Sequence, residues 1–361
     1  MSPFPPIRRI CVWSGVGFVP TSMVYSTYGY KEGLRVYSFE GSASMKSAMD
    51  LLLFSYGTVE DIGINIQTIG SSGGLEKVLS GKTDFALVSH DVSEFKNGKY
   101  KTQWESKKIR TLTLAKELMT VVYKPPRGCH EDLVISKDNV NTFYSVFSGH
   151  RHSEMKGSHF SDLLKNDNVN QRCKVKIKAW VRSSGPTKSG TATAFVNNPI
   201  LTSQTSHNEW LQKVKSPSYG NEVKTLFYAP ESNALAFSHF VKNLREGSMI
   251  YLPSSFVFTN WSIIRKLGLK VAKFKQSESE ISLSKHNFKS QSGKYNWERQ
   301  FNLLYSVDTI TGDSGKNKLV KYIAENVGSL EVLHLIPNNG CCNEIEKWDT
   351  TLNSSDQKSR K

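Results

Sequence analysis

The sequence predicts an α/β fold, because short apolar strands alternate with helical segments along most of its 361 residues. Strands that alternate with helices form mostly parallel sheets. The length suggests about two domains, and three strand-to-helix junctions are rich in glycine, serine and threonine. Ligands of such folds bind beyond the carboxyl ends of the strands. These junctions are therefore where we expect a site.

In the first part of the chain, a strand at 34–39 ends at Gly41, and Ser44 is predicted to cap the following helix. Apolar residues occur there at the spacing of one helical face, namely Met45, Ala48, Met49, Leu52 and Leu53. The next predicted elements are strands at 64–68 and 84–88, with a short helix at 75–79 between them.

The later part of the chain repeats this alternation. We predict strands at 118–123, 175–181 and 249–252, and helices that include 234–244 and 319–323. The strand at 175–181 ends beside Arg182, and the loop after it leads into Ser189, Gly190 and Thr191.

The charge and the cysteines restrict the class of protein. Lys and Arg number 47 against 32 Asp and Glu, a net charge of +15 that favours phosphate groups, nucleic acid or acidic lipid as partners. A solvated basic surface is the alternative. Five cysteines without a C-x-x-C motif argue against a disulfide scaffold, and Cys341 and Cys342 are expected to be unpaired thiols. No metal or other cofactor is predicted.

The beginning of the chain resembles a secretory signal. Arg8 and Arg9 precede a short apolar run at 10–19, which is too short and too rich in glycine to span a membrane convincingly. Residues 1–33 are therefore expected to be a leader or a flexible arm, and the polar residues 346–361 a disordered tail. A cytosolic extension is the alternative for the leader.

Three junctions have the composition of an anion site, namely 41–44, 70–74 and 189–191. Each would place backbone N–H groups and a hydroxyl at the positive end of a helix. Arg182, at the end of an apolar strand, needs a fixed anionic partner. That partner is either a ligand oxyanion or an internal Asp or Glu.

A serine hydrolase is a minor alternative. The segment Gly70-x-Ser72-x-Gly74 has the spacing of a nucleophile elbow between a strand and a helix. Hydrolases of that fold need several strands before the elbow, and about two precede this one.

Several motifs together resemble the substrate-binding proteins of bacterial phosphate ABC transporters. They occur in the family's order from about residue 36 to 340, at 69–74 with 83–86, 146–149, 182 with 189–191, 247–251 and 335–337. The resemblance implies a type II periplasmic-binding-protein fold, in which two α/β lobes enclose a cleft. It places the hinge crossings near 120–124 and 252–258, so that lobe 1 is 34–122 plus 257–345 and lobe 2 is 123–256.

The same resemblance implies the phosphate-binding residues. They are Ser44, Met45, Ser71, Ser89, Arg182, Ser189, Gly190 and Thr191. Ser89 stands where the family has a carboxylate, and Asp91 is the nearest candidate acceptor. Arg182 precedes Ser189 by more residues than the family motif has, so the loop contains an insertion. These departures leave the choice between phosphate and sulfate open.

The resemblance therefore predicts a receptor without catalytic activity. It would bind inorganic phosphate or a related oxyanion at the outer face of the cell membrane and deliver it to the permease of an ABC transporter. We expect a monomer with no specific nucleic-acid partner. The alternative is a degenerate family member that acts as a basic surface adhesin or polyanion binder, whose binding would depend strongly on salt.

Overall fold

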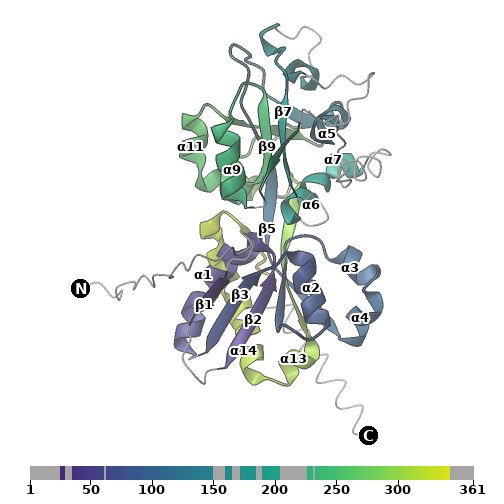
Figure 1. Cartoon of the computed structure of the whole chain (residues 1–361), viewed down its shortest axis with the longest axis vertical. Helices are drawn as coiled ribbons and strands as arrows, with labels where there is room; N and C mark the ends of the chain where they lie inside the picture. The colour runs from purple at the N-terminus through teal and green to yellow at the C-terminus, as the bar shows by residue number, and fades with distance from the viewer. Residues whose placement is uncertain are drawn as a thin grey trace, which may run out of the picture.

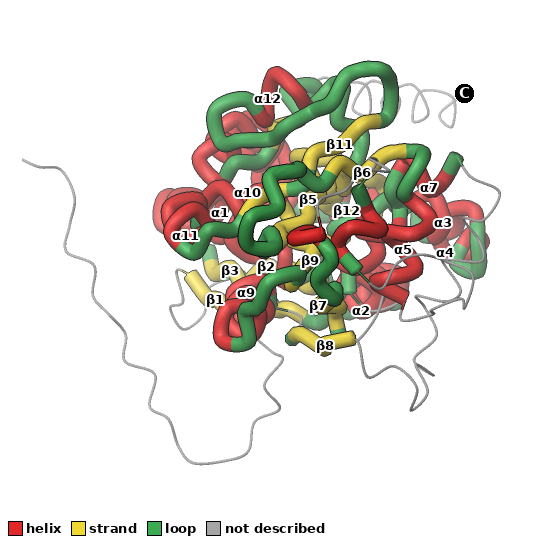
Figure 2. The backbone as a smooth tube through the Cα atoms, turned by 90° about the horizontal axis from the view of Figure 1, so that it is seen from above, coloured by secondary structure: helices red, strands yellow, loops and turns green. Residues whose placement is uncertain are grey.

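The chain forms two lobes stacked along its long axis in a computed structural model, and strand β5 (Ile109–Tyr123) runs through both (Figure 1). Seen from above, the strands lie in the middle and helices flank them on both sides (Figure 2). The structure describes residues 25–28, 35–60, 62–148, 159–164, 171–183, 189–203, 226–230 and 232–341. Most of the predicted leader, the loop at 184–188, Cys342 and the predicted tail lie outside the described residues. The predicted α/β fold is confirmed.

The lower lobe is built on parallel strands in the order β3, β2, β4, with β12 antiparallel to β4 and to β5. Besides β5, the strands of this lobe are β1 (Tyr25–Tyr28), β2 (Val36–Gly41), β3 (Gly63–Thr68), β4 (Phe85–Val88), β12 (Glu298–Ser306) and β13 (Ile336–Pro337). Its helices are η1 (Ala43–Met45), α1 (Lys46–Val59), α2 (Ser71–Leu79), α3 (Ser93–Asn97), α4 (Lys101–Ser106), α13 (Val307–Thr311), α14 (Ser314–Asn326) and η4 (Val327–Leu333).

The upper lobe repeats the plan, with β8, β7 and β9 parallel and β9 antiparallel to the end of β5. Its strands are β6 (Val134–Ser136), β7 (Lys178–Arg182), β8 (Leu226–Ala229), β9 (Ser248–Pro253), β10 (Lys270–Val271) and β11 (Lys273–Lys275). Its helices are α5 (Val140–Ser148), η2 (Phe160–Leu163), η3 (Gln171–Cys173), α6 (Gly190–Val196), α7 (Pro199–Thr202), α9 (Asn233–Lys242), α10 (Ser254–Thr259), α11 (Trp261–Lys266) and α12 (Phe288–Gln291).

Each lobe has its own apolar core, and the cores place the boundary differently from the sequence prediction. The upper core begins at Leu118 on β5 and ends at Trp297, and it includes Val257 and Phe258. The lower core resumes at Phe301. Residues 257–297 therefore pack in the upper lobe, and the chain returns through β12 rather than near 252–258. The physical reason is that α10, which follows β9 directly, covers β5 and β9 instead of leaving them.

Two local expectations also need correction. Residues 25–28 lie within the predicted leader, yet they form β1, which pairs antiparallel with β3 at the edge of the sheet. Ser42, not Ser44, provides the N-cap at the first junction, because its hydroxyl accepts a hydrogen bond from the backbone N–H of Ser44 at 3.3 Å. The short helix η1 then leads into α1.

The sequence argues against a disulfide scaffold, and the structure contains a disulfide that the sequence did not predict. Cys129 and Cys173 are joined by a disulfide in the upper lobe, across a sequence separation of 44 residues. Glu131 lies beside both sulfur atoms, but sulfurs joined to each other are not the thiolates that bind a metal. Cys341 lies outside this disulfide, and its buried sulfur donates a hydrogen bond to the Thr113 carbonyl at 2.9 Å.

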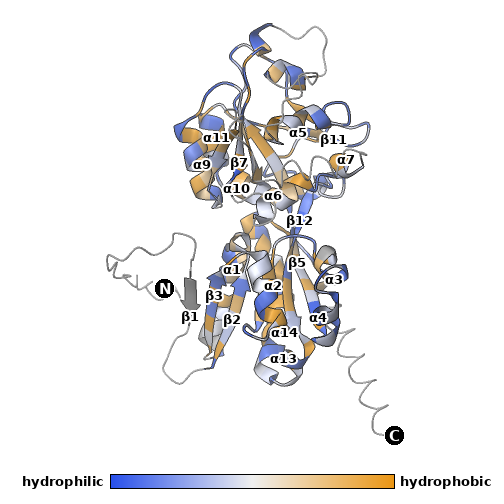
Figure 3. Cartoon of the chain, turned by 45° about the vertical axis from the view of Figure 1, so that its right-hand side comes forward, coloured by the Kyte–Doolittle hydropathy of each residue, from blue (hydrophilic) through white to orange (hydrophobic). Residues whose placement is uncertain are grey.

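The helices carry apolar residues interspersed with polar ones (orange and blue in Figure 3), which is the pattern of helices that cover a sheet with one face. Among the described residues, none of the helices is both long and apolar enough to cross a membrane.

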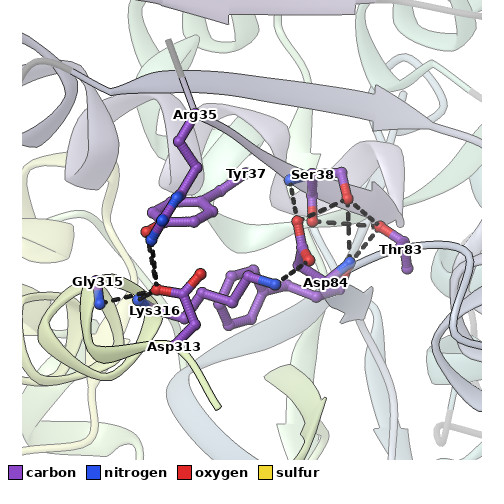
Figure 4. Close-up of polar contacts among 9 residues, drawn as sticks. Arg35, Tyr37, Ser38, Thr83, Asp84, Asp313, Gly315 and Lys316 are labelled. Carbon is purple, nitrogen blue, oxygen red and sulfur yellow. Dashed lines mark hydrogen bonds and ion pairs between the residues drawn. The ribbon is translucent and has the colours of Figure 1, made fainter. Parts of the chain in front are cut away.

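An ion-pair network fixes α14 to the sheet of the lower lobe (Figure 4). Asp313 caps α14, accepting hydrogen bonds from the backbone N–H groups of Gly315 and Lys316, and it also pairs with Arg35 at 3.0 Å. Lys316 reaches Asp84 at 2.7 Å. Asp84 precedes β4 and Arg35 precedes β2, so the network holds the amino ends of these strands. The ligand sites of such folds lie at the opposite ends.

Candidate functional site

Three serines of the lower lobe meet where parallel strands end. Ser42 follows β2, Ser71 begins α2 after β3, and Ser89 follows β4. The hydroxyl of Ser42 donates to that of Ser89 at 2.7 Å, and the backbone N–H of Ser89 donates to the Ser71 hydroxyl at 3.3 Å. Because the three strands are neighbours and parallel, their carboxyl ends place these hydroxyls at one point.

The start of α6 brings the upper lobe to the same point. Ser189 caps α6 through a hydrogen bond from the Ala192 N–H at 3.2 Å. Gly190 packs so closely on Ser89 that a Cβ there would lie 2.4 Å from the Ser89 hydroxyl oxygen. The structure therefore brings Ser71, Ser89, Ser189, Gly190 and Thr191 together across the two lobes, from segments far apart in sequence.

Ser44 and Met45 have different surroundings. Ser44 lines the pocket between the lobes. The Met45 side chain is fully buried in the lower core. What Met45 can offer a ligand is therefore its backbone, not its side chain.

Arg182 lies at the end of β7, as expected, and is buried. Its guanidinium donates to the Pro230 carbonyl at 2.9 Å and to the Asn233 side-chain oxygen at 2.7 Å. It also lies over the Tyr251 ring, 5.8 Å from the centroid. These contacts fix Arg182 against the start of α9. Asn233 itself lines the interlobe pocket, so Arg182 stands directly behind one wall of it.

Asp91 is engaged elsewhere. It is exposed, and its carboxylate accepts hydrogen bonds from the backbone N–H and the hydroxyl of Ser93, at 2.9 and 2.7 Å. Asp91 thus holds the start of α3. The structure does not bring it into the hydrogen-bonded group of Ser42, Ser71 and Ser89.

The spacing of Gly70, Ser72 and Gly74 has a packing explanation. A Cβ on Gly74 would lie 2.2 Å from the Glu40 carbonyl oxygen, so this glycine lets α2 pack directly on β2. Gly70 has a positive φ of 86° where the strand turns into the helix. A close helix and a tight turn account for both glycines without a nucleophile.

A pocket of about 380 Å³ lies between the lobes. Its charged lining residues are Glu117 and Arg299, which are opposite each other in the register of β5 and β12. Its other lining residues are Ala43, Ser44, Ser47, Ala48, Ser232, Asn233, Ala234, Ser255, Phe256, Thr259, Asn260, Phe301, Leu333 and Leu335.

Glu117 and Arg299 form an ion pair whose side chains are 2% and 1% exposed. Nε of Arg299 donates to Glu117 at 2.7 Å, and Nη1 donates to the Thr191 hydroxyl at 3.1 Å. Ser255 donates to the other oxygen of Glu117. This pair is not among the residues predicted from the sequence. A signal for Glu117 exists, because it is a charged residue directly before the predicted apolar strand at 118–123, as Arg182 is a charged residue directly after one.

The comparisons with known proteins agree with this architecture. No protein-family model matches the chain. A protein of Mycoplasma genitalium described as an uncharacterized lipoprotein is 27% identical over 325 residues, which cover 83% of each chain. An ABC-type phosphate transport receptor from Vibrio cholerae superposes with a TM-score of 0.55 at 16% identity, over 84% of this chain and all of that one.

A phosphate-binding protein from Stenotrophomonas maltophilia gives a TM-score of 0.54 at 11% identity, over 86% of this chain and 92% of that one. The chain has the fold of the phosphate-binding receptors.

Proposed function

We propose that this protein is an extracytoplasmic solute receptor that binds inorganic phosphate or a related oxyanion between its lobes and delivers it to an ABC permease. The observation that carries the proposal is the meeting of the Ser42–Ser71–Ser89 group with Gly190 across the lobes. Hydroxyls and helix starts that converge at the ends of parallel strands suit an oxyanion.

The residues proposed to bind the anion are those implied by the resemblance, namely Ser44, Met45, Ser71, Ser89, Arg182, Ser189, Gly190 and Thr191. Asp91 remains a candidate acceptor only if the loop before α3 rearranges, because its carboxylate is held by Ser93. Ligand binding is expected to act on the hinge formed by β5 and β12, the strands that connect the two cores.

Two observations support a location outside the cytoplasm. The Cys129–Cys173 disulfide is of a kind that persists in oxidising surroundings. The Mycoplasma relative is described as a lipoprotein. We propose that the protein acts as a monomer at the outer face of the membrane.

Calorimetry of the full chain with inorganic phosphate, sulfate and a short DNA duplex tests the proposal. Saturable phosphate binding with one site per chain, little affected by added sodium chloride, is expected. The net charge of +15 keeps a polyanion binder as the second candidate. DNA binding that falls steeply with salt, without phosphate binding, would favour that candidate and contradict the receptor.

A further inference from the structure

The Arg299–Glu117 pair is more than a structural contact, because of where it lies. Removing two charges from water is costly, and a buried pair is seldom the most stable choice for a core. Here the pair forms part of the wall of the interlobe pocket, on the two strands that connect the lobes. Polar and charged groups that line a pocket are the ones that can orient a ligand there.

Arg299 can offer hydrogen bonds to a ligand in addition to those it makes. Its contacts with Glu117 and Thr191 use one N–H on each of its three nitrogens. A guanidinium has five N–H donors, so Nη1 and Nη2 each carry a second one. Thr191 lies in the first turn of α6, next to Gly190, which packs on Ser89. Arg299 therefore donates a hydrogen bond directly to one of the residues proposed to bind the anion.

Glu117 places a carboxylate at the interlobe pocket, which Asp91 does not line. Asp91 holds α3, and Ser89 is neutral. A carboxylate accepts a hydrogen bond from a protonated ligand oxygen, but it faces a fully ionised anion as a like charge. Near neutral pH phosphate retains a proton and sulfate does not.

We propose that Arg299 binds the anionic oxygens of the ligand and that Glu117 orients Arg299 and selects an oxyanion that carries a proton. This inference rests on the proposed oxyanion-binding function and adds two residues to it. The ligand class is a protonated oxyanion such as hydrogen phosphate. Sulfate is the anion that the pair rejects.

Calorimetry with inorganic phosphate and sulfate at neutral pH tests the inference on the full chain. In Arg299→Lys the charge beside Glu117 stays but the planar fork is lost, and phosphate binding should weaken at least about tenfold. In Glu117→Gln the preference for phosphate over sulfate should fall at least about tenfold. A double variant, Glu117→Leu with Arg299→Met, should lose phosphate binding while remaining folded, since apolar replacement of a buried pair is often tolerated.

The matched control is the neighbouring ion pair Lys116–Glu298, 2.5 Å apart on the same two strands but more exposed. Lys116→Met with Glu298→Leu should leave both affinities unchanged. If folded Arg299→Lys binds phosphate like the wild type, the role of Arg299 is overturned and the receptor function stands. If Glu117→Gln keeps its selectivity, the role of Glu117 is overturned. A wild type that binds neither anion overturns both the inference and the proposed function.

Discussion

Arg182 and Arg299 are both buried, but they lie in different parts of the molecule and contact different groups. Arg182 is held inside the upper lobe by the neutral oxygens of Pro230 and Asn233. Arg299 is paired with the carboxylate of Glu117 on the hinge strands and also reaches Thr191. Arg182 therefore lies behind a wall of the pocket, whereas Arg299 and its carboxylate partner form part of the wall itself.

The two arginines illustrate two ways to stabilise a buried guanidinium, namely hydrogen bonds to neutral oxygens and an ion pair with a carboxylate. Neutral acceptors can be lost one at a time, at the cost of a hydrogen bond each. Removing the carboxylate of an ion pair leaves an uncompensated charge buried away from water, which costs more. Mutations of the Glu117–Arg299 pair should therefore lower the stability of the protein more than mutations around Arg182, although both arginines are candidates for binding the same ligand.

The largest expected effect follows from removing Glu117. Glu117→Ala leaves Arg299 buried and without its counter-charge, and it should lower the free energy of unfolding by about 3–5 kcal/mol. Asn233→Ala removes a neutral acceptor of Arg182 and should cost about 1–3 kcal/mol. Urea unfolding of the two variants, followed by circular dichroism, measures the difference.

The control for this comparison is the double variant Glu117→Leu with Arg299→Met, which should regain most of the lost stability because no charge is left unpaired. If Glu117→Ala costs no more than Asn233→Ala, the contrast between the two arginines is not energetic.

The second prediction concerns the first turn of α6, which contains Gly190 and Thr191. Gly190→Ala would place a Cβ 2.4 Å from the Ser89 hydroxyl, and the resulting shift should cost about 1–3 kcal/mol and weaken phosphate binding. Gly328→Ala is the matched control, because nothing lies within 4 Å of its Cβ position. Adding Ser89→Ala to Gly190→Ala removes the clashing oxygen and should restore the approach of α6. Normal phosphate binding by Gly190→Ala alone would show that the start of α6 is not at the site.

The fold could be predicted from sequence because its signals are local. The Gly-Ser junctions after β2 and β3 follow from neighbouring residues, and so does the position of Arg182 at the end of β7. The direction in which the Arg182 side chain points cannot be predicted from neighbouring residues, because it depends on contacts with Pro230 and Asn233, which are 48 and 51 residues away in the sequence.

The hinge pair is harder still to predict. Glu117 and Arg299 are 182 residues apart and meet only through the register of β5 and β12. The lobe boundary fails for a related reason, since 257–297 can be assigned to the upper core only when its packing is known.

The third prediction tests whether Arg182 binds the anion. Arg182→Met should weaken phosphate binding at least about tenfold, because a charged hydrogen bond is worth about 1.5–3 kcal/mol. Asn233→Ala serves as its partner variant: if Arg182 acts by positioning Asn233, the two variants should weaken binding equally and their effects should not add. Calorimetry on the single and double variants separates the two roles, and unchanged affinity in folded Arg182→Met would exclude both.

The smallest loss of stability is expected for the ion-pair network at Asp313. This network lies at the amino ends of the strands of the lower lobe, away from the proposed site, and so serves as a comparison for the Glu117–Arg299 pair. Partial burial raises the pKa of Asp313, but the N–H groups of Lys316 and Gly315 and the charge of Arg35 outweigh it, so the pKa is lowered overall. A carboxyl whose pKa is lowered by folding stabilises the protein above its unfolded pKa, and this contribution is lost as the pH falls through the folded value.

Asp313→Asn keeps an oxygen for the cap but removes the charge, and at pH 7 it should lower the free energy of unfolding by about 0.3–1 kcal/mol. The difference from the wild type should shrink once the pH falls below about 4, where the unfolded carboxyl takes up its proton. Urea unfolding at pH 7 and pH 3 measures both values, and phosphate affinity at pH 7 should not change. A loss of affinity in Asp313→Asn would mean that charge anywhere in the lower lobe influences the ligand, and the distinction between Arg299 and a general basic surface would then fail.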